Sequence, residues 1–133
     1  MGDGENQEGS IWEAAMSASN YKLNNLIGIV DKNNIQQCGF TDEIMSLGSL
    51  VEKWESFGWF VLEIDGHNME EIIQALDKTA YINDKPSLIV SNTIKGKGVS
   101  FMENDNKWHG GGAIKDNADK AIKEVEKFSK NPI

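Results

Sequence analysis

Residues 2–36 read GDGENQEGSIWEAAMSASNYKLNNLIGIVDKNNIQ, and this stretch decides the fold. Ser10 and Glu13 have the Ser-x-x-Glu spacing of a capping box, so we expect a helix that begins there and runs to about Asn20. Residues 26–30 (LIGIV) form a short, nearly continuous apolar run, which is typical of a strand buried in a parallel sheet. The stretch is therefore interpreted as a turn, a helix, a strand and a second turn.

The rest of the chain continues this alternation of helices and strands. Ser49 begins a second Ser-x-x-Glu pattern, and the helix that it caps is expected to end at Gly58. Strands are expected over residues 59–64 and 87–93, and Asn68 is expected to cap the helix between them. A last helix carries one apolar stripe, made of Ala118, Ala121, Ile122, Val125 and Phe128. This order predicts an α/β fold with a mostly parallel sheet and helices on both faces.

Composition narrows the class of protein. A chain of 133 residues with 39% hydrophobic residues suits one globular domain. The net charge of −8 argues against a general nucleic-acid or anionic-membrane surface. Cys38 is the single cysteine, so no internal disulfide can form and a reducing compartment is expected. With no apolar stretch near the roughly 20 residues of a membrane span, and no secretory pattern, we expect a soluble cytoplasmic protein.

Three loops are placed where open α/β sheets bind their ligands, at the carboxyl ends of the strands. Two of them, residues 31–35 and residues 94–98, follow predicted strands. The third is the Gly-Asp-Gly of residues 2–4, which we expect to follow a strand that the sequence does not contain. The pair Asn24 and Asn25 precedes its strand, so we do not expect these side chains to be ligands.

The Gly-Asp-Gly loop and the loop of residues 31–35 carry residues suited to an anion and a metal ion. Gly2 and Gly4 permit positive φ and let backbone N–H groups approach a phosphate closely. Asp3 offers a hard oxygen ligand, and the Asn33 side chain and the Ile35 carbonyl can supply two more. Oxygen ligands with few charges, completed by a diphosphate, describe a Mg²⁺ site. The alternative is that both loops are ordinary turns, which is what a lone Gly-Asp-Gly most often is.

The two histidines differ in their surroundings. His109 lies in a glycine-rich loop over residues 95–112, within the sequence NKWHGGG. A histidine in an aromatic-flanked loop of this kind is functional about as often as it is structural. His67 follows Asp65 and Gly66, and we expect it to be a surface turn residue.

Together these segments resemble the thiamine diphosphate-binding domain of transketolases. The family's Gly-Asp-Gly, its intervening helix and strand and its Asn-containing loop are matched almost continuously by residues 2–36. The resemblance continues through GFTDEIM, FGWFVLEIDGHN, IKGKGVSFMEN and KWHG, so it covers nearly the whole chain. The pattern is that of the N-terminal half-subunit of transketolases whose gene is split in two.

The resemblance implies a metal and cofactor site. Asp3, the Asn33 side chain and the Ile35 carbonyl would hold Mg²⁺, which grips the diphosphate of thiamine diphosphate. The Gly4 N–H and Asn33 would contact the same diphosphate, and Lys95 matches a basic residue of the cofactor pocket.

The resemblance also implies a catalytic residue and an interface. His109 matches a histidine that reaches both the diphosphate and the reacting sugar phosphate, so it is the expected catalytic residue. Glu8 and Glu13 match acids that lie at the dimer interface, where family members are thought to couple two active sites. The reaction implied is the transfer of a two-carbon ketol unit between sugar phosphates, as in the pentose phosphate pathway.

Residues 1–133 would then be the C-terminal part of the diphosphate-binding domain. The family's pyrimidine-binding domain and the segment before Gly-Asp-Gly are not in the sequence, so we expect activity only with partners that supply both, in a homo- or hetero-oligomer. The alternatives are another thiamine diphosphate enzyme, such as a deoxyxylulose phosphate synthase or a dehydrogenase E1 component, and a non-catalytic relic or assembly protein. KWHG favours a transketolase, and the intact set of Asp3, Asn33, Lys95 and His109 opposes a relic.

Overall fold

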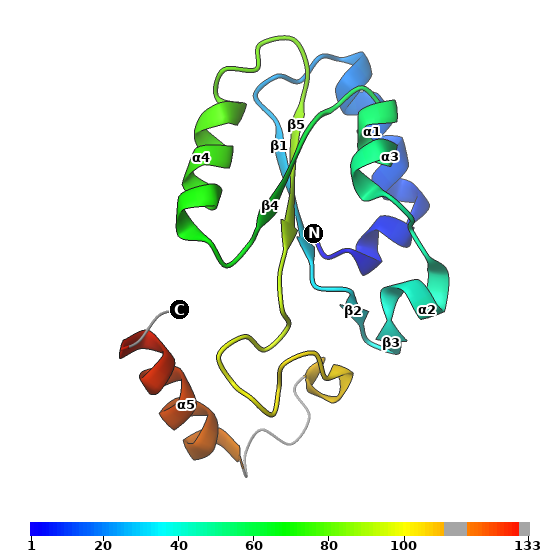
Figure 1. Cartoon of the computed structure of the whole chain (residues 1–133). Helices are drawn as coiled ribbons and strands as arrows, with labels where there is room; N and C mark the ends of the chain where they lie inside the picture. The colour runs from blue at the N-terminus through cyan, green and yellow to red at the C-terminus, as the bar shows by residue number, and fades with distance from the viewer. Residues whose placement is uncertain (111–116, 131–133) are drawn as a thin grey trace.

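A three-stranded parallel sheet forms the centre of the molecule. The computed structural model describes residues 1–110 and 117–130, without the side chains of residues 128–130. The strands β1 (Ile27–Lys32), β4 (Phe60–Asp65) and β5 (Ser87–Asn92) lie in the order β1–β5–β4, as Figure 1 shows. The register aligns Lys32, Asn92 and Asp65 at the carboxyl end of the sheet. The predicted α/β class is confirmed.

Helices cover both faces of this sheet. On one face lie α1 (Gly9–Asn20) and α3 (Leu50–Ser56), and on the other face lies α4 (Met69–Thr79), as Figure 1 shows. A small hairpin of β2 (Ile35–Gln36) and β3 (Gly39–Phe40) follows β1 and leads into the short helix α2 (Thr41–Met45).

The core lies between the sheet and the α1–α3 layer. Val30, Leu88 and Val90 point into it from the strands and are fully buried. Trp54 of α3 packs edge to face on Trp59, with their ring centroids 4.8 Å apart. Burying an aliphatic side chain such as those of Val30, Leu88 and Val90 stabilises the fold by about 1.5–3 kcal/mol.

Most helix ends follow the predicted caps. The Ser49 side chain accepts a hydrogen bond from the Glu52 N–H at 3.2 Å, so Ser49 is confirmed as the N-cap of α3. Asn68 accepts from the N–H groups of Glu70 and Glu71, as predicted for α4.

The capping box at Ser10 is wrong. The 3₁₀ turn η1 (Gly4–Gln7) delivers the chain directly to α1, whose N-cap is Glu8 without a side-chain cap. Since α1 begins at Gly9, Ser10 already lies inside the first helical turn, where it cannot serve as the N-cap.

The first residues of the chain pair with the outer edge of β1. Gly2 forms a parallel bridge to Asp31, and the Asp31 N–H donates to the Met1 carbonyl at 2.9 Å. Toward the other end of β1, Leu26, Ile27 and Ile29 are 40%, 42% and 47% exposed. Residues 1–3 therefore lie where a further strand beside β1 would end.

The last helix, α5 (Ala118–Lys130), packs on the loop after β5 and stands apart from the sheet (Figure 1). The Ser100 N–H donates to Glu124 at 2.6 Å, and this hydrogen bond lowers the pKa of the Glu124 carboxyl. Ile122 and Val125 are 56% and 48% exposed, so the described residues leave the predicted apolar stripe largely uncovered. The Phe128 side chain and residues 111–112 of the glycine-rich loop lie outside the described part of the chain.

Within the described ranges, no helix has both the length and the apolar character that a membrane crossing requires.

Candidate functional site

A pocket of about 350 Å³ lies beside the turn that follows β1. Three separate parts of the chain line it: the Gly-Asp-Gly segment with the start of α1, the β1–β2 connection, and the loop before α5. The lining residues are Gly2, Asp3, Gly4, Glu5, Glu8, Asn33, Ile35, Gln36 and His109. The structure thus brings together in one pocket most of the residues singled out in the sequence.

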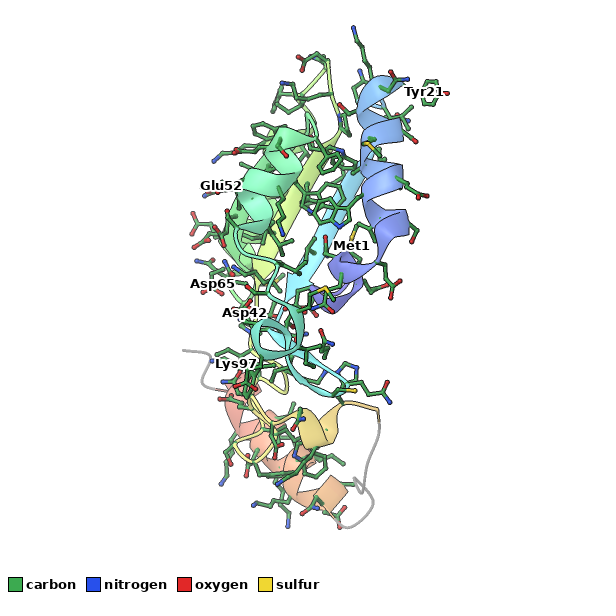
Figure 2. The ribbon with its side chains drawn as sticks, turned by 90° about the vertical axis from the view of Figure 1, so that its right-hand side faces the viewer. Met1, Tyr21, Asp42, Glu52, Asp65 and Lys97 are labelled. Atoms are coloured by element: carbon green, nitrogen blue, oxygen red, sulfur yellow. The ribbon has the colours of Figure 1, made fainter. Side chains whose placement is uncertain are left out.

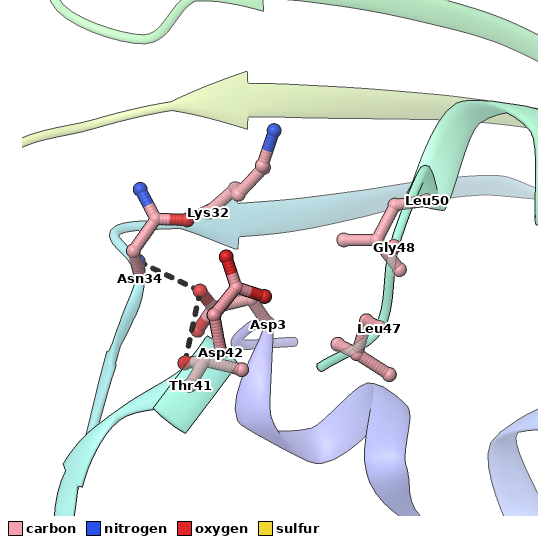
Figure 3. A pocket seen from close by; sticks show the side chains of 8 residues that line it. All are labelled: Asp3, Lys32, Asn34, Thr41, Asp42, Leu47, Gly48 and Leu50. Atoms are coloured by element: carbon pink, nitrogen blue, oxygen red, sulfur yellow. Dashed lines mark hydrogen bonds between the residues drawn. The ribbon is translucent and has the colours of Figure 1, made fainter. Parts of the chain in front are cut away.

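Asp3 is the buried acid of this site. It is 3% exposed and stands at the N-cap of η1. One carboxylate oxygen accepts from the Gly4 N–H at 2.9 Å; the other accepts from the Asn34 N–H at 2.7 Å and the Thr41 hydroxyl at 3.3 Å. Figure 3 shows the contacts with Asn34 and Thr41. These three donors hold the carboxylate in one orientation.

Burial raises the pKa of Asp3 above its ordinary value of 3.8. The hydrogen bonds from Asn34, Gly4 and Thr41 act in the opposite direction, and the nearby Asp31 carboxylate adds to the rise. Burial therefore disfavours the charged form of Asp3 in the chain alone. A cation placed next to the carboxylate would favour that form.

The turn after β1 explains how Asn34 and Thr41 reach Asp3. Asn34 has φ of +60°, a left-handed conformation that asparagine tolerates better than most residues, and this turns its N–H toward Asp3. The β2–β3 hairpin then returns the chain, so that the Thr41 N–H donates to the Asn34 carbonyl at 3.0 Å. Asn33 closes the same turn, because its side-chain oxygen accepts from the Ile35 N–H at 3.0 Å.

Asp3 also borders a second, smaller pocket of about 150 Å³, drawn in Figure 3. Lys32, Asp42 and Leu50 are among its lining residues. The Lys32 ammonium lies 3.3 Å from the Glu63 carboxylate, which also accepts from the Asn92 side chain at 3.0 Å. The bond from Asn92, with a smaller contribution from Lys32, lowers the pKa of Glu63. Lys32 therefore pairs across the sheet and leaves Asp3 without an ion-pair partner from this side.

The donor set fits a hard cation bound with few protein charges. The Gln36 side-chain oxygen is buried and has no hydrogen-bond partner among the described residues. Gln36 lines the larger pocket with Asp3 and Asn33. Carboxylate and amide oxygens are the ligands that Mg²⁺ takes alongside phosphates and water. No group of three or more His, Cys, Asp or Glu side chains that could hold a metal occurs among residues 1–110 and 117–130. The residues present therefore suit Mg²⁺ shared with an anionic ligand.

Gly4 lies in close contact with the β2–β3 hairpin. A Cβ on Gly4 would lie 3.2 Å from both the Cβ and the side-chain oxygen of Gln36. A side chain at position 4 would therefore need Gln36 to move by a few tenths of an ångström. The positive φ that glycine permits is not adopted at Gly2 or Gly4.

Lys95 follows β5 as predicted, but it does not line the larger pocket. Its carbonyl accepts from the Asn104 N–H at 3.0 Å, which folds the loop back on itself. The same loop returns His109 to the pocket, directly after the 3₁₀ turn η2 (Asn106–Trp108). The loop fold thus separates Lys95 from His109, and the role of Lys95 stays a prediction.

The remaining predicted positions are found outside the pocket or at its rim. Glu8 lines the pocket at the start of α1, and Glu13 is exposed on the same helix. Asn24 donates to the Asn83 carbonyl at 2.9 Å near the other end of β1, so it lies away from the pocket. His67 is exposed as predicted, and its Nε2 additionally accepts from the Ile94 N–H at 2.7 Å.

Sequence reasoning missed three residues of the site. Asn34 contributes through its backbone, Thr41 through a hydroxyl placed by the hairpin, and Gln36 through packing on Gly4. The Asn-Asn pair after β1 was a usable signal for Asn34. Thr41 and Gln36 carry no signal in their spacing, because only the hairpin brings them to Asp3.

Known proteins are similar to this chain over most of its length. The family described as "Transketolase, thiamine diphosphate binding domain" matches residues 1–132. A component of the apulose-4-phosphate transketolase of Phocaeicola vulgatus is 50% identical over 125 residues, which cover 94% of this chain and 44% of that protein. The SqwG component of the 6-deoxy-6-sulfo-D-fructose transketolase of a Clostridium species is 52% identical over 103 residues, 77% of this chain and 38% of that protein. Both relatives are named as transketolase subunits.

A solved structure agrees with these relatives. The transketolase of Campylobacter jejuni superposes with a TM-score of 0.84 at 34% identity, over 97% of this chain and 20% of that one. The coverages of 44% and 38% mean that the chain spans less than half the length of the two curated relatives described above.

Proposed function

The chain belongs to the transketolase family, in its thiamine diphosphate-binding domain, and on this premise we propose that it is a fragment or subunit of a working transketolase. In this proposal the chain binds Mg²⁺ and the diphosphate of the cofactor, and the complete enzyme transfers a two-carbon ketol unit between sugar phosphates. The cofactor supplies the chemistry that stabilises the transferred two-carbon unit.

One observation carries this proposal: the pocket that joins the Gly-Asp-Gly turn, the turn after β1 and His109. Asp3, the Asn33 side chain and the Ile35 carbonyl are the proposed metal ligands, and Gly4 and Asn33 are the proposed diphosphate contacts. The buried carboxylate of Asp3 and the unpartnered oxygen of Gln36 support a cation at this place. Lys95 is proposed to reach the cofactor from the loop after β5.

The proposed partners are inferred from the share of its relatives' length that the chain covers. It spans less than half of relatives that are named as transketolase subunits, so we propose that residues 1–133 are the C-terminal part of a diphosphate-binding domain. An N-terminal segment and a pyrimidine-domain subunit would complete the enzyme. Glu8 and Glu13 are both exposed in this chain, as residues that meet a partner must be. We propose that they lie at the dimer interface, and that the enzyme works in the cytoplasm.

The names of the relatives favour a transketolase over the other thiamine diphosphate enzymes considered. Two of them act, by their names, on apulose 4-phosphate and on 6-deoxy-6-sulfo-D-fructose. Sugars or sugar phosphates of this kind are therefore the first substrates to test with the completed enzyme.

Isothermal titration with thiamine diphosphate and Mg²⁺ tests the proposal. The chain is titrated alone and after assembly with the N-terminal segment and a pyrimidine-domain subunit. Tight, Mg²⁺-dependent binding by the assembled protein is expected. An assembled protein that binds no cofactor would instead support the non-catalytic alternative.

We expect His109→Ala to lower turnover more than it lowers cofactor affinity. His109 lies in the pocket beside the Gly-Asp-Gly turn, on a loop that can face both a diphosphate and a sugar. Its loss should therefore reduce kcat by at least about tenfold more than it raises the apparent Kd for the cofactor. His67→Gln is the matched control, because His67 lies outside the pocket and glutamine keeps an acceptor for the Ile94 N–H. Equal losses in kcat and affinity would make His109 a cofactor ligand only.

The raised pKa of Asp3 predicts an unusual dependence of stability on pH. A carboxyl whose pKa is raised by folding contributes stability below its ordinary pKa of 3.8, and this contribution is lost as the pH rises through the folded-state value. With divalent cations removed by a chelator, Asp3→Ala should therefore cost the assembled enzyme more thermal stability at acidic pH than at pH 7.

Glu63→Ala is the control with the opposite sign. The pKa of Glu63 is lowered, so its contribution is present above its ordinary value of 4.5 and is lost as the pH falls through the folded-state value. Thermal unfolding midpoints of both variants, measured from acidic pH to pH 7, show how each loss of stability depends on pH. The interpretation of Asp3 is wrong if both variants show the same trend.

A further inference from the structure

Asn6 is a fully buried polar residue within an aromatic core. It is 0% exposed and lies in η1, three residues after Asp3. Trp54 and Trp12 both contact it, and their own rings are 5.3 Å apart. A buried amide is costly unless its polar atoms find partners, so each of its contacts matters.

All four nitrogen and oxygen atoms of Asn6 are hydrogen-bonded within the chain. Its backbone N–H donates to the Asp3 carbonyl at 3.0 Å, and its side-chain Nδ2 donates to the Gly2 carbonyl at 2.9 Å. Its side-chain Oδ1 accepts from the Trp54 indole at 3.0 Å, and its carbonyl accepts from the Trp12 indole at 2.9 Å. Because an indole N–H can only donate and a carbonyl can only accept, the orientation of the amide is fixed by its partners.

These contacts join the site to the core. Two of them hold the carbonyls of Gly2 and Asp3, in the turn that presents the Asp3 carboxylate to the pocket. The other two come from α1 and α3, which lie on the viewer's side of the sheet in Figure 2. Any rotation of the Gly-Asp-Gly turn must therefore break a hydrogen bond to a buried residue.

We propose that Asn6 is a positioning residue, which transmits the rigidity of the Trp12–Trp54 core to the Gly-Asp-Gly turn and so sets the affinity for the metal–diphosphate group. This rests on the proposed function, because it takes the pocket to be the diphosphate site. An apolar residue at position 6 would fill the core without a partner for either the Gly2 carbonyl or the Trp54 indole. The amide instead gives the turn a fixed direction, which lowers the entropic cost of ordering it around a ligand.

Two tryptophan variants provide a matched test. Trp54→Phe removes the indole that donates to Asn6, while Trp59→Phe removes an indole that donates to the Ala15 carbonyl. Both bonds are buried and 3.0 Å long, and both residues belong to the same core, so similar losses of thermal stability are expected. Only Trp54→Phe leaves the Asn6 amide oxygen without its donor.

The test uses the chain assembled with its proposed partners, and thiamine diphosphate with Mg²⁺ as the probe. Trp54→Phe is expected to raise the apparent Kd by about three- to tenfold, the usual effect of one buried hydrogen bond, and Trp59→Phe to change it less than about twofold. Asn6→Ala removes this contact and also the bond to the Gly2 carbonyl while it keeps the Trp54 ring, so it should weaken binding at least as much as Trp54→Phe. Equal affinity losses in Trp54→Phe and Trp59→Phe, or wild-type affinity in Asn6→Ala, would overturn the proposal.

Hydrogen exchange separates this inference from the proposed function. Amides of residues 2–8 are expected to exchange several-fold faster in Trp54→Phe than in Trp59→Phe, without any cofactor present. Absence of cofactor binding by the wild-type assembly would reject the proposed function alone. Unchanged exchange of residues 2–8 in Trp54→Phe would reject the role of Asn6, whatever the assembly binds.

Discussion

Replacing Asp3 by alanine is expected to raise the apparent Kd of the assembled enzyme for thiamine diphosphate by more than about tenfold, a loss above about 1.4 kcal/mol. Asp3 is the buried carboxylate of the pocket, and three donors fix its orientation toward the proposed cation. In the proposed site, the loss of Asp3 would deprive Mg²⁺ of its charged protein ligand and so weaken the hold on the diphosphate. Titration calorimetry at saturating Mg²⁺ measures the change.

The same experiment distinguishes the asparagine pair after β1, Asn33 and Asn34, from the pair before it, Asn24 and Asn25. Asn33→Ala should also weaken Mg²⁺-dependent binding, because Asn33 lines the pocket. Asn25→Ala is the matched control, since Asn25 is exposed and precedes β1, at the end of the strand remote from the pocket. If Asn25→Ala weakens binding as much as Asn33→Ala, the site has been placed at the wrong end of the strand. Thermal unfolding of each variant checks that a loss of affinity is not a loss of folding.

The 133 residues expressed alone are expected to show no ketol transfer and to associate. Ile27 and Ile29 are two residues apart in β1, so both point to the same face of the sheet. Both are more than 40% exposed. Met69 and Ile73 on α4 add a second exposed apolar surface, at 67% and 55%. Exposed apolar surfaces and an unpaired strand edge both promote association.

Binding of the whole cofactor would also require a partner polypeptide. Its diphosphate would meet this chain, while its ring would have no pocket among the described residues. Light scattering after gel filtration measures the association, and a coupled enzyme assay measures ketol transfer. A stable monomer with activity of its own would contradict the proposal that other polypeptides complete the site.

The longer helices and the three strands of the sheet could be predicted because each has a local pattern, whereas the β2–β3 hairpin and α2 were not predicted. The apolar runs gave β1, β4 and β5 to within about two residues, and the Asn68 cap placed the start of α4. The N-cap of α1 is Glu8, two residues before the predicted Ser10, because the chain enters the helix directly from η1. The strand order could not be predicted, since no local pattern states which strands are neighbours.

The residues of the candidate site could likewise be predicted where they stand in a local motif, and not where tertiary contacts place them. Asp3, Asn33, Ile35 and His109 stand in recognisable motifs, and the structure places all four in one pocket. The residues that hold Asp3 do not stand in motifs, because their contacts depend on the β2–β3 hairpin and on the core. Asn6 shows this most clearly: its neighbours in sequence are polar, and the donor to its buried side-chain oxygen is Trp54, 48 residues away.

The order β1–β5–β4 also sets the sequence of events during synthesis. Apart from the short bridge between Gly2 and Asp31, both outer strands pair, within the described residues, with β5 alone. Neither therefore has its partner strand in the sheet until residues 87–92 have left the ribosome. Until then β1 and β4 are isolated apolar segments, which depend on their adjoining helices for cover. Contacts this distant in sequence slow folding and prolong the exposure of aggregation-prone strands. A nascent chain stopped before Ser87 should therefore lack the sheet entirely and become a substrate for chaperones, while one extended past Asn92 can close all three strands in a single step.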